Sequence, residues 1–79
     1  MADVTVRYWA GARAAAGLDD ERLQAGSVEA LVRQLSARTP ALAPVLALSS
    51  LLVDGRVARG HVDLVDGAVV EVRPPVAGG

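Results

Sequence analysis

Residues 74–79 are the part of this chain whose types and spacing are best suited to chemistry. They read Pro-Pro-Val-Ala-Gly-Gly and close on Gly78 and Gly79, which carry no side chain. A backbone without Cβ atoms fits a channel too narrow for other residues, while Pro74 and Pro75 favour an extended stem. Six extended residues reach roughly 20 Å, which is far enough to enter another protein. We expect a tail that presents the Gly79 carboxylate to a partner; the alternative is an ordinary frayed terminus.

Other reactive groups are scarce in this sequence. Cysteine is absent, which removes disulfides, thiolate nucleophiles and thiolate metal sites together. The one histidine, His61, is near Asp63 but is isolated from any further His or Cys, so we predict a surface loop and no metal site. The segment from Gly11 to Gly17 lacks the spacing and the lysine of a phosphate-binding loop, so nucleotide binding is not predicted.

The composition excludes several classes of partner. Charges are scattered around a net value of −1, without the basic stripe of a nucleic-acid-binding protein. No apolar run is long enough to cross a bilayer and no leader pattern is present, so we expect a cytoplasmic protein without a membrane partner. With 52% hydrophobic residues and only two aromatics, the core must consist of small aliphatics, and some apolar surface is expected to face a partner.

Lysine is absent as well, so arginine supplies every positively charged side chain apart from any protonated histidine. One interpretation is a GC-rich coding bias. The alternative is functional: a chain whose terminus becomes an acylating agent benefits from having no side-chain amine to capture it.

The elements that must position the tail are indicated by hydrophobic periodicity. Alternation over residues 4–9 and 68–73 predicts a first and a last strand, and apolar positions spaced three and four apart after the cap Ser27 predict a helix that ends before Pro40. A short helix over 12–16, a polar strand over 19–25, a strand over 50–53 and at most one extra helical turn around Pro44 complete the order.

This order predicts an α+β domain, with one main helix packed across a mixed sheet of four to five strands. The two terminal strands are expected to pair in parallel, because the helical middle of the chain provides the crossover. The last strand would then lie in the centre of the sheet. We therefore expect a globular domain over residues 1–73 and a flexible tail over 74–79.

Several motifs resemble the small, sulfur-carrying subunit of molybdopterin synthase, a ubiquitin-like family with the β-grasp fold. They are Val4-x-Val6-x-Tyr8-Trp9-Ala10-x-x-Arg13, Val53-Asp54-Gly55, Leu64-x-Asp66-Gly67 and Pro74-Pro75-Val76-Ala77-Gly78-Gly79. The resemblance covers essentially the whole chain. Its most specific part is the Pro-Pro-x-x-Gly-Gly segment directly after a strand.

The resemblance implies a definite chemistry. An ATP-dependent activating enzyme would adenylate the Gly79 carboxylate, and a sulfur donor protein would help convert the adenylate into a thiocarboxylate. Residues Pro74, Pro75, Val76, Ala77 and Gly78 would insert into the large synthase subunit of a heterotetramer. Sulfur would then pass to cyclic pyranopterin monophosphate in molybdenum cofactor biosynthesis. The chain itself would bind no cofactor and would be a non-catalytic, sulfur-donating subunit of a sulfurtransferase complex.

The family resemblance also places a partner interface at Trp9, Val57 and Arg73. The sequence departs from the family at Arg73, where a bulky aromatic residue is common, and at Ala68, where an acidic residue is common. Two alternatives stay open. The chain is a carrier for another pathway, such as thiamine, cysteine or transfer-RNA thiolation, although Pro74-Pro75 argues against the thiamine type. Otherwise it is a ubiquitin-like binding module that is never activated.

Overall fold

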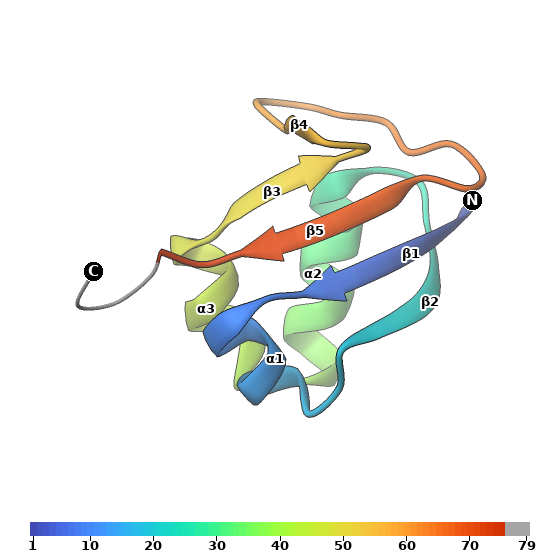
Figure 1. The fold of residues 1–79 in the computed structure, drawn as a ribbon. Helices are drawn as coiled ribbons and strands as arrows, with labels where there is room; N and C mark the ends of the chain where they lie inside the picture. The colour runs from blue at the N-terminus through green and yellow to red at the C-terminus, as the bar shows by residue number, and fades with distance from the viewer. Residues whose placement is uncertain (76–79) are drawn as a thin grey trace.

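The computed structural model describes residues 1–75, so the predicted tail residues Val76, Ala77, Gly78 and Gly79 lie outside the described residues. The described chain forms a five-stranded mixed sheet with helices packed behind it (Figure 1). The face of the sheet turned toward the viewer in Figure 1 carries no helix of the described residues, and we call it the outer face. The predicted α+β architecture is confirmed.

The sheet contains β1 (Ala2–Tyr8), β2 (Asp20–Ala25), β3 (Ser50–Val53), β4 (Arg56–Val57) and β5 (Val69–Arg73), in the spatial order β2-β1-β5-β3-β4. The terminal strands β1 and β5 run in parallel, as predicted, and β5 pairs antiparallel with β3 on its other side. The strand that leads into the tail is therefore central and is hydrogen-bonded on both sides.

Three helices lie on the other face of the sheet: α1 (Ala10–Ala16), α2 (Val28–Arg38) and α3 (Leu42–Leu48). The main helix, α2, begins as predicted at Ser27, whose hydroxyl accepts a hydrogen bond from the backbone N–H of Ala30 at 3.1 Å. It ends at Thr39, directly before Pro40. No helix within residues 1–75 is long and apolar enough to cross a membrane.

Helix α3 is longer than the single turn predicted around Pro44. The proline does not interrupt it because Pro44 is its third residue, within the first turn, where backbone N–H groups have no intrahelical acceptor. Leu42 and Leu46, four residues apart, then bury the same side of the helix in the core.

The core lies between the sheet and the helices and consists of aliphatic residues and one aromatic ring. Strands β1 and β5 contribute alternate residues, and α2 contributes the stripe predicted from its periodicity. The most completely buried large side chains are those of Val6, Leu31, Leu35, Leu42, Val70 and Val72. The core thus fixes which side of β1 and β5 faces outward.

Candidate functional site

The tail begins at a well-supported point of the sheet. Arg73, the last residue of β5, lies opposite Ser50 of β3, and the preceding Val72 lies between Tyr8 of β1 and Leu51 of β3. Pro74 is partly buried and Pro75 is exposed. Figure 1 shows that the chain leaves the sheet at the end where α1 and α3 lie. The strand that leads into the tail is therefore hydrogen-bonded on both sides near its last residues.

The register of the strands assembles one row of side chains across the outer face. Arg7 pairs with Glu71, Glu71 with Leu52, and Leu52 with Val57, so these four residues from β1, β5, β3 and β4 share that face. Val69 precedes Glu71 by two positions and points the same way. The β5, β3 and β4 side of the outer face therefore carries the apolar side chains of Val69, Leu52 and Val57 beside the charged Glu71 and Arg73.

The β2 and β1 side of the same face is polar. Arg22 lies opposite Thr5, Gln24 opposite Asp3, and the side-chain amide of Gln24 donates to Asp3 Oδ1 at 2.8 Å. This contrast divides the outer face into a hydrophilic half and an apolar half. The apolar half includes β5 and the two strands beside it, β3 and β4. The start of the tail therefore lies next to an apolar surface.

A cluster of three side chains lies next to the start of the tail. The Arg73 guanidinium lies over the Trp9 ring, with Cζ 4.7 Å from the ring centroid, a cation–π arrangement. Arg73 Nη2 and Nε donate to Glu71 Oε1 at 2.8 and 3.2 Å. Trp9 Nε1 donates to the same oxygen at 3.1 Å. We call Trp9, Glu71 and Arg73 the exit cluster.

The exit cluster depends on an ionised Glu71. The hydrogen bonds from Arg73 hold the pKa of the Glu71 carboxyl below its ordinary value, and the charges of Arg73 and Arg7 and the Trp9 hydrogen bond act in the same direction, against the effect of burial. Its side chain is only 16% exposed. The carboxylate therefore stays charged at neutral pH and keeps both donors.

The three residues predicted for a partner interface all lie on or beside the outer face. Trp9, at the N-cap of α1, contacts Arg73. Trp9 is 41% exposed, and the Arg73 side chain is 49% exposed. Val57 is 50% exposed and is separated from β5 by β3, a spacing of roughly 10 Å over two strands. The structure thus joins two of them directly and places the third in the same apolar half.

Sequence reasoning missed Glu71 and Leu52. A signal for Glu71 was available, because the inward-facing Val70 and Val72 force Glu71 and Arg73 onto the same outer side. Leu52 was harder to identify, since its outward direction follows only from the pairing of β3 with β5.

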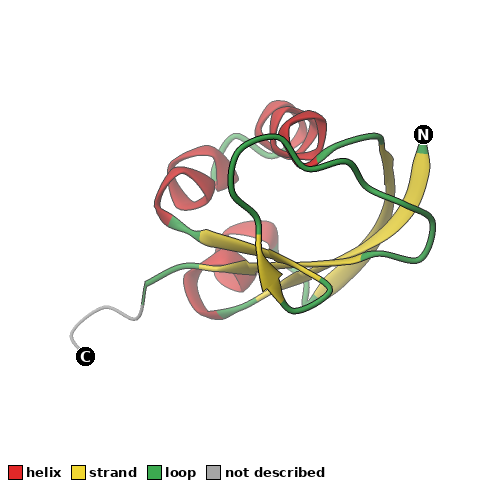
Figure 2. Ribbon diagram, turned by 90° about the horizontal axis from the view of Figure 1, so that it is seen from above, coloured by secondary structure: helices red, strands yellow, loops and turns green. Residues whose placement is uncertain are grey.

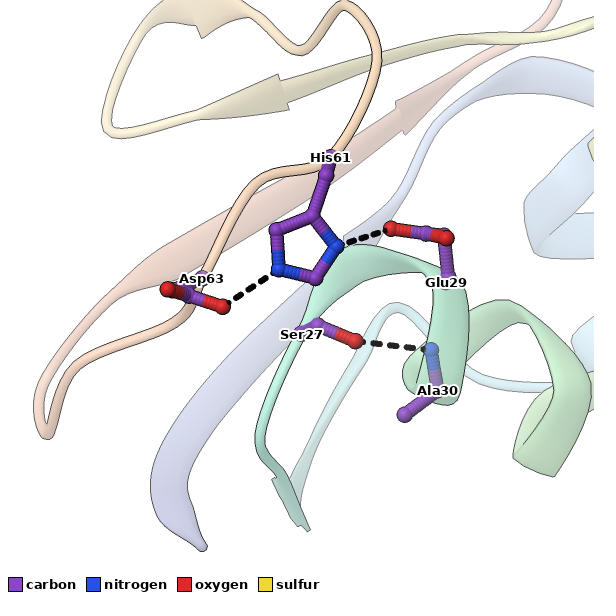
Figure 3. A network of polar contacts seen from close by, with 5 residues as sticks. All are labelled: Ser27, Glu29, Ala30, His61 and Asp63. Carbon is purple, nitrogen blue, oxygen red and sulfur yellow. Dashed lines mark hydrogen bonds and ion pairs between the residues drawn. The ribbon is translucent and has the colours of Figure 1, made fainter.

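His61 occupies a different part of the molecule, beside Asp63 as predicted and also beside Glu29, which was not predicted. In Figure 3 its ring lies between two carboxylates: Nδ1 is 2.6 Å from Glu29 Oε1 and Nε2 is 2.7 Å from Asp63 Oδ1. These contacts, Asp63 first and Glu29 second, raise the His61 pKa. The prediction of an exposed loop position is correct. No group of metal-ligating side chains occurs in the described part of the chain.

The His61 contacts hold the loop between β4 and β5 against the start of α2. Backbone hydrogen bonds from Val28 N to Val62 O and from Leu64 N to Gly26 O, both 3.0 Å, reinforce the same attachment. Figure 2, seen from above, shows this loop passing beside α2 before it returns to the sheet. The attachment lies toward the start of β1, whereas the tail leaves from the opposite end, so His61 is not part of the exit cluster.

The strand order, with parallel terminal strands and a helix packed across them, defines a ubiquitin-like β-grasp protein. The family model described as the ThiS family matches residues 6–79, and the chain therefore belongs to this family of sulfur carriers. A comparison with curated proteins yields no matching sequence.

Solved structures support the same assignment. A protein from Pyrococcus furiosus, assigned as molybdopterin converting factor subunit 1, is 29% identical with a TM-score of 0.87, covering 96% of this chain and 100% of its own. Small archaeal modifier protein 1 from Methanosarcina acetivorans is 27% identical with a TM-score of 0.88, covering 100% and 98%. The fold is also shared by a chain in a complex of subunits 1 and 2 of the molybdopterin-converting factor from Helicobacter pylori. That chain is 22% identical with a TM-score of 0.75, and the match covers 98% of this chain and 99% of the other.

Proposed function

We propose that this chain is the sulfur carrier and small subunit of a molybdopterin synthase. The observation that carries the proposal is the position where the tail begins: Pro74-Pro75 follow a central strand that is paired on both sides and lies beside an exposed apolar surface. Membership of the ThiS family supplies the class of chemistry. The 29% identity to the Pyrococcus furiosus protein assigned as molybdopterin converting factor subunit 1 supports the choice of pathway.

The reacting group in this proposal is the Gly79 carboxylate. A carboxylate is a poor electrophile, so an activating enzyme first joins it to the α-phosphate of ATP and releases pyrophosphate. Sulfur delivered at the sulfide level by a donor protein then attacks the acyl carbon, and the acyl–phosphate bond breaks to release AMP and leave a thiocarboxylate. When that sulfur passes to cyclic pyranopterin monophosphate, water restores the carboxylate. The chain needs no nucleophilic side chain of its own, in agreement with its lack of cysteine.

The large synthase subunit is the proposed partner of the apolar half of the outer face. Trp9, Leu52 and Val57 provide contact area, and aromatic residues are common energetic centres of interfaces. The exit cluster lies between this surface and Pro74. A partner that covers the surface therefore receives the tail without any rearrangement of β5. The proposed complex is a heterotetramer of this chain and the large synthase subunit.

The first experiment measures whether the tail accepts sulfur. The chain is produced together with its activating enzyme and a sulfur donor, and its C-terminal peptide is weighed. Exchange of oxygen for sulfur adds about 16 Da. A variant lacking Gly79 should fold normally and gain nothing. A wild-type peptide that never gains this mass, while ATP is consumed by the activating enzyme, would contradict the proposal.

A protein modifier is the second candidate, favoured by the match to small archaeal modifier protein 1 over the full chain. In that case the activated Gly79 carbonyl forms an amide with an amine of another protein and releases the leaving group. Mass spectrometry distinguishes the two: a modifier leaves a C-terminal peptide that ends in Pro74-Pro75-Val76-Ala77-Gly78-Gly79 joined through Gly79 to target lysines, whereas a synthase subunit leaves none and transfers sulfur to the pterin. A carrier for another pathway gains sulfur but fails with the pterin.

A further inference from the structure

We propose that Glu71 is a positioning residue for tail delivery: its carboxylate holds the Arg73 guanidinium over Trp9 and so fixes the surface from which the tail departs. This inference rests on the proposed function for its role in delivery. Its structural content, that Glu71 orders the other two side chains, is testable on the isolated chain.

The geometry of the exit cluster makes Glu71 the common partner. One oxygen, Oε1, accepts from Trp9 Nε1 at 3.1 Å and from Arg73 at 2.8 and 3.2 Å. The remaining contact, between Arg73 and the Trp9 ring at 4.7 Å, closes the cluster. Arg73 and Trp9 thus share two links, one direct and one through Glu71, and loss of the carboxylate removes every hydrogen bond of the cluster at once.

The exit cluster directly adjoins the start of the tail. Arg73 directly precedes Pro74, and the Trp9 backbone N–H donates to Val72 O at 3.1 Å. Pro74 also restricts the backbone of the residue before it to extended conformations. The exit cluster therefore fixes the side chain of a residue whose backbone is already constrained by the sheet on one side and by proline on the other.

The surroundings of Glu71 favour positioning over a general stabilising role. Exposed ion pairs contribute little to global stability, and Arg73 is 49% exposed. An arginine that moves freely, however, must be ordered whenever a partner covers it, and this weakens binding. Because arginine has no rigid ring of its own, the carboxylate of Glu71 supplies the order that an aromatic residue at position 73 would have without help.

The test compares Glu71→Ala and Glu71→Gln with a matched control, Glu29→Gln. Glu29 is also a glutamate in an ion pair, but it is more exposed than Glu71, contacts His61 near the start of α2 and is remote from the tail. Trp9 is the only tryptophan, so its fluorescence and its indole N–H resonance report on the cluster without interference. The Arg73 Nε–H resonance reports on the guanidinium.

In the isolated chain, Glu71→Ala should shift the Trp9 indole resonance and make the Arg73 Nε–H exchange rapidly with water. Glu71→Gln keeps an acceptor oxygen and should show a smaller effect, and Glu29→Gln should match the wild type. Unchanged Trp9 and Arg73 signals in Glu71→Ala would overturn the proposal. Far-UV circular dichroism checks that each variant is folded.

In sulfur transfer, Glu71→Ala should raise the concentration of loaded chain needed for half-maximal rate about fivefold and leave the saturated rate unchanged. An unchanged half-saturating concentration, despite disordered Arg73, would overturn the role in delivery. If wild-type chain itself transfers no sulfur, the proposed function fails. The two resonances then still decide whether Glu71 orders the exit cluster.

Discussion

Replacement of Tyr8 by phenylalanine tests how the end of β1 is held beside the exit cluster. The Tyr8 ring is buried in the core, with 3% of its surface exposed, and its hydroxyl donates to Glu21 Oε2 at 2.5 Å. Arg38 Nη2 donates to the same oxygen at 2.6 Å, so the three side chains connect β1, β2 and α2. Burial and the Glu21 carboxylate both raise the Tyr8 pKa, so the hydroxyl remains a donor throughout the ordinary pH range.

The magnitude of the effect follows from what remains after the substitution. Tyr8→Phe preserves the ring and its packing, and Glu21 keeps the bond from Arg38, so no buried charge is left without a partner. A hydrogen bond to a charged group contributes about 1.5–3 kcal/mol, and the 17% exposure of the Glu21 side chain allows water to replace part of it. We expect a loss of about 1.5 kcal/mol.

Urea denaturation followed by Trp9 fluorescence and by circular dichroism measures this loss. The midpoint should fall while the slope stays constant, and the thermal midpoint should fall by roughly 6–12 °C for a chain of this size. Arg38→Ala in the same background gives a double-mutant cycle for the shared carboxylate. A loss below about 0.5 kcal/mol, or a gain, would refute the view that this contact secures β1 to α2.

Three further predictions concern the loop, the docking surface and the tail. Because folding raises the His61 pKa, the contribution of His61 to stability is fully present below the unfolded pKa of about 6.5 and is lost as pH rises through the folded value. His61→Asn should therefore lower stability more near pH 6 than near pH 9. An equal loss at both pH values would contradict the ion pairs. Val57→Asp should weaken binding of the large subunit at least tenfold, or about 1.4 kcal/mol, by calorimetry. The control Val65→Asp, at a valine that is also exposed but lies outside the outer-face row, should have no effect. Replacing Pro74-Pro75 by two alanines should weaken the same binding about two- to tenfold by making the free stem more flexible, and unchanged affinity would remove the stem from the account.

The sequence was most informative where local pattern decides structure. The alternation of Val4, Val6 and Tyr8 predicts the buried side of β1, and the parallel pairing with β5 follows from the helical crossover. The turn at Asp54-Gly55 is also as predicted, with φ values of 49° and 84° that suit this residue pair. The alternation and the turn depend on neighbours in the chain, and the parallel pairing depends on the order of the elements.

The missed features depend on residues far apart in the chain. Glu29 and His61 are 32 positions apart, and no local pattern places a carboxylate beside that ring. Likewise, Trp9 and Glu71 are 62 positions apart and meet only through the register of β1 with β5. Helix α3 was predicted as a single turn around Pro44, although a proline in the first turn does not interrupt a longer helix.

The central claim is that Gly79 carries sulfur for dithiolene formation, and a single-turnover transfer measures it most directly. Thiocarboxylated chain is mixed with the large subunit and cyclic pyranopterin monophosphate, and the masses of the chain and the pterin are followed together. A dithiolene holds two sulfur atoms, so we predict that two chains each lose about 16 Da for every pterin converted. A chain that keeps its sulfur in this mixture, while a known synthase subunit loaded in the same way releases it, would contradict the account.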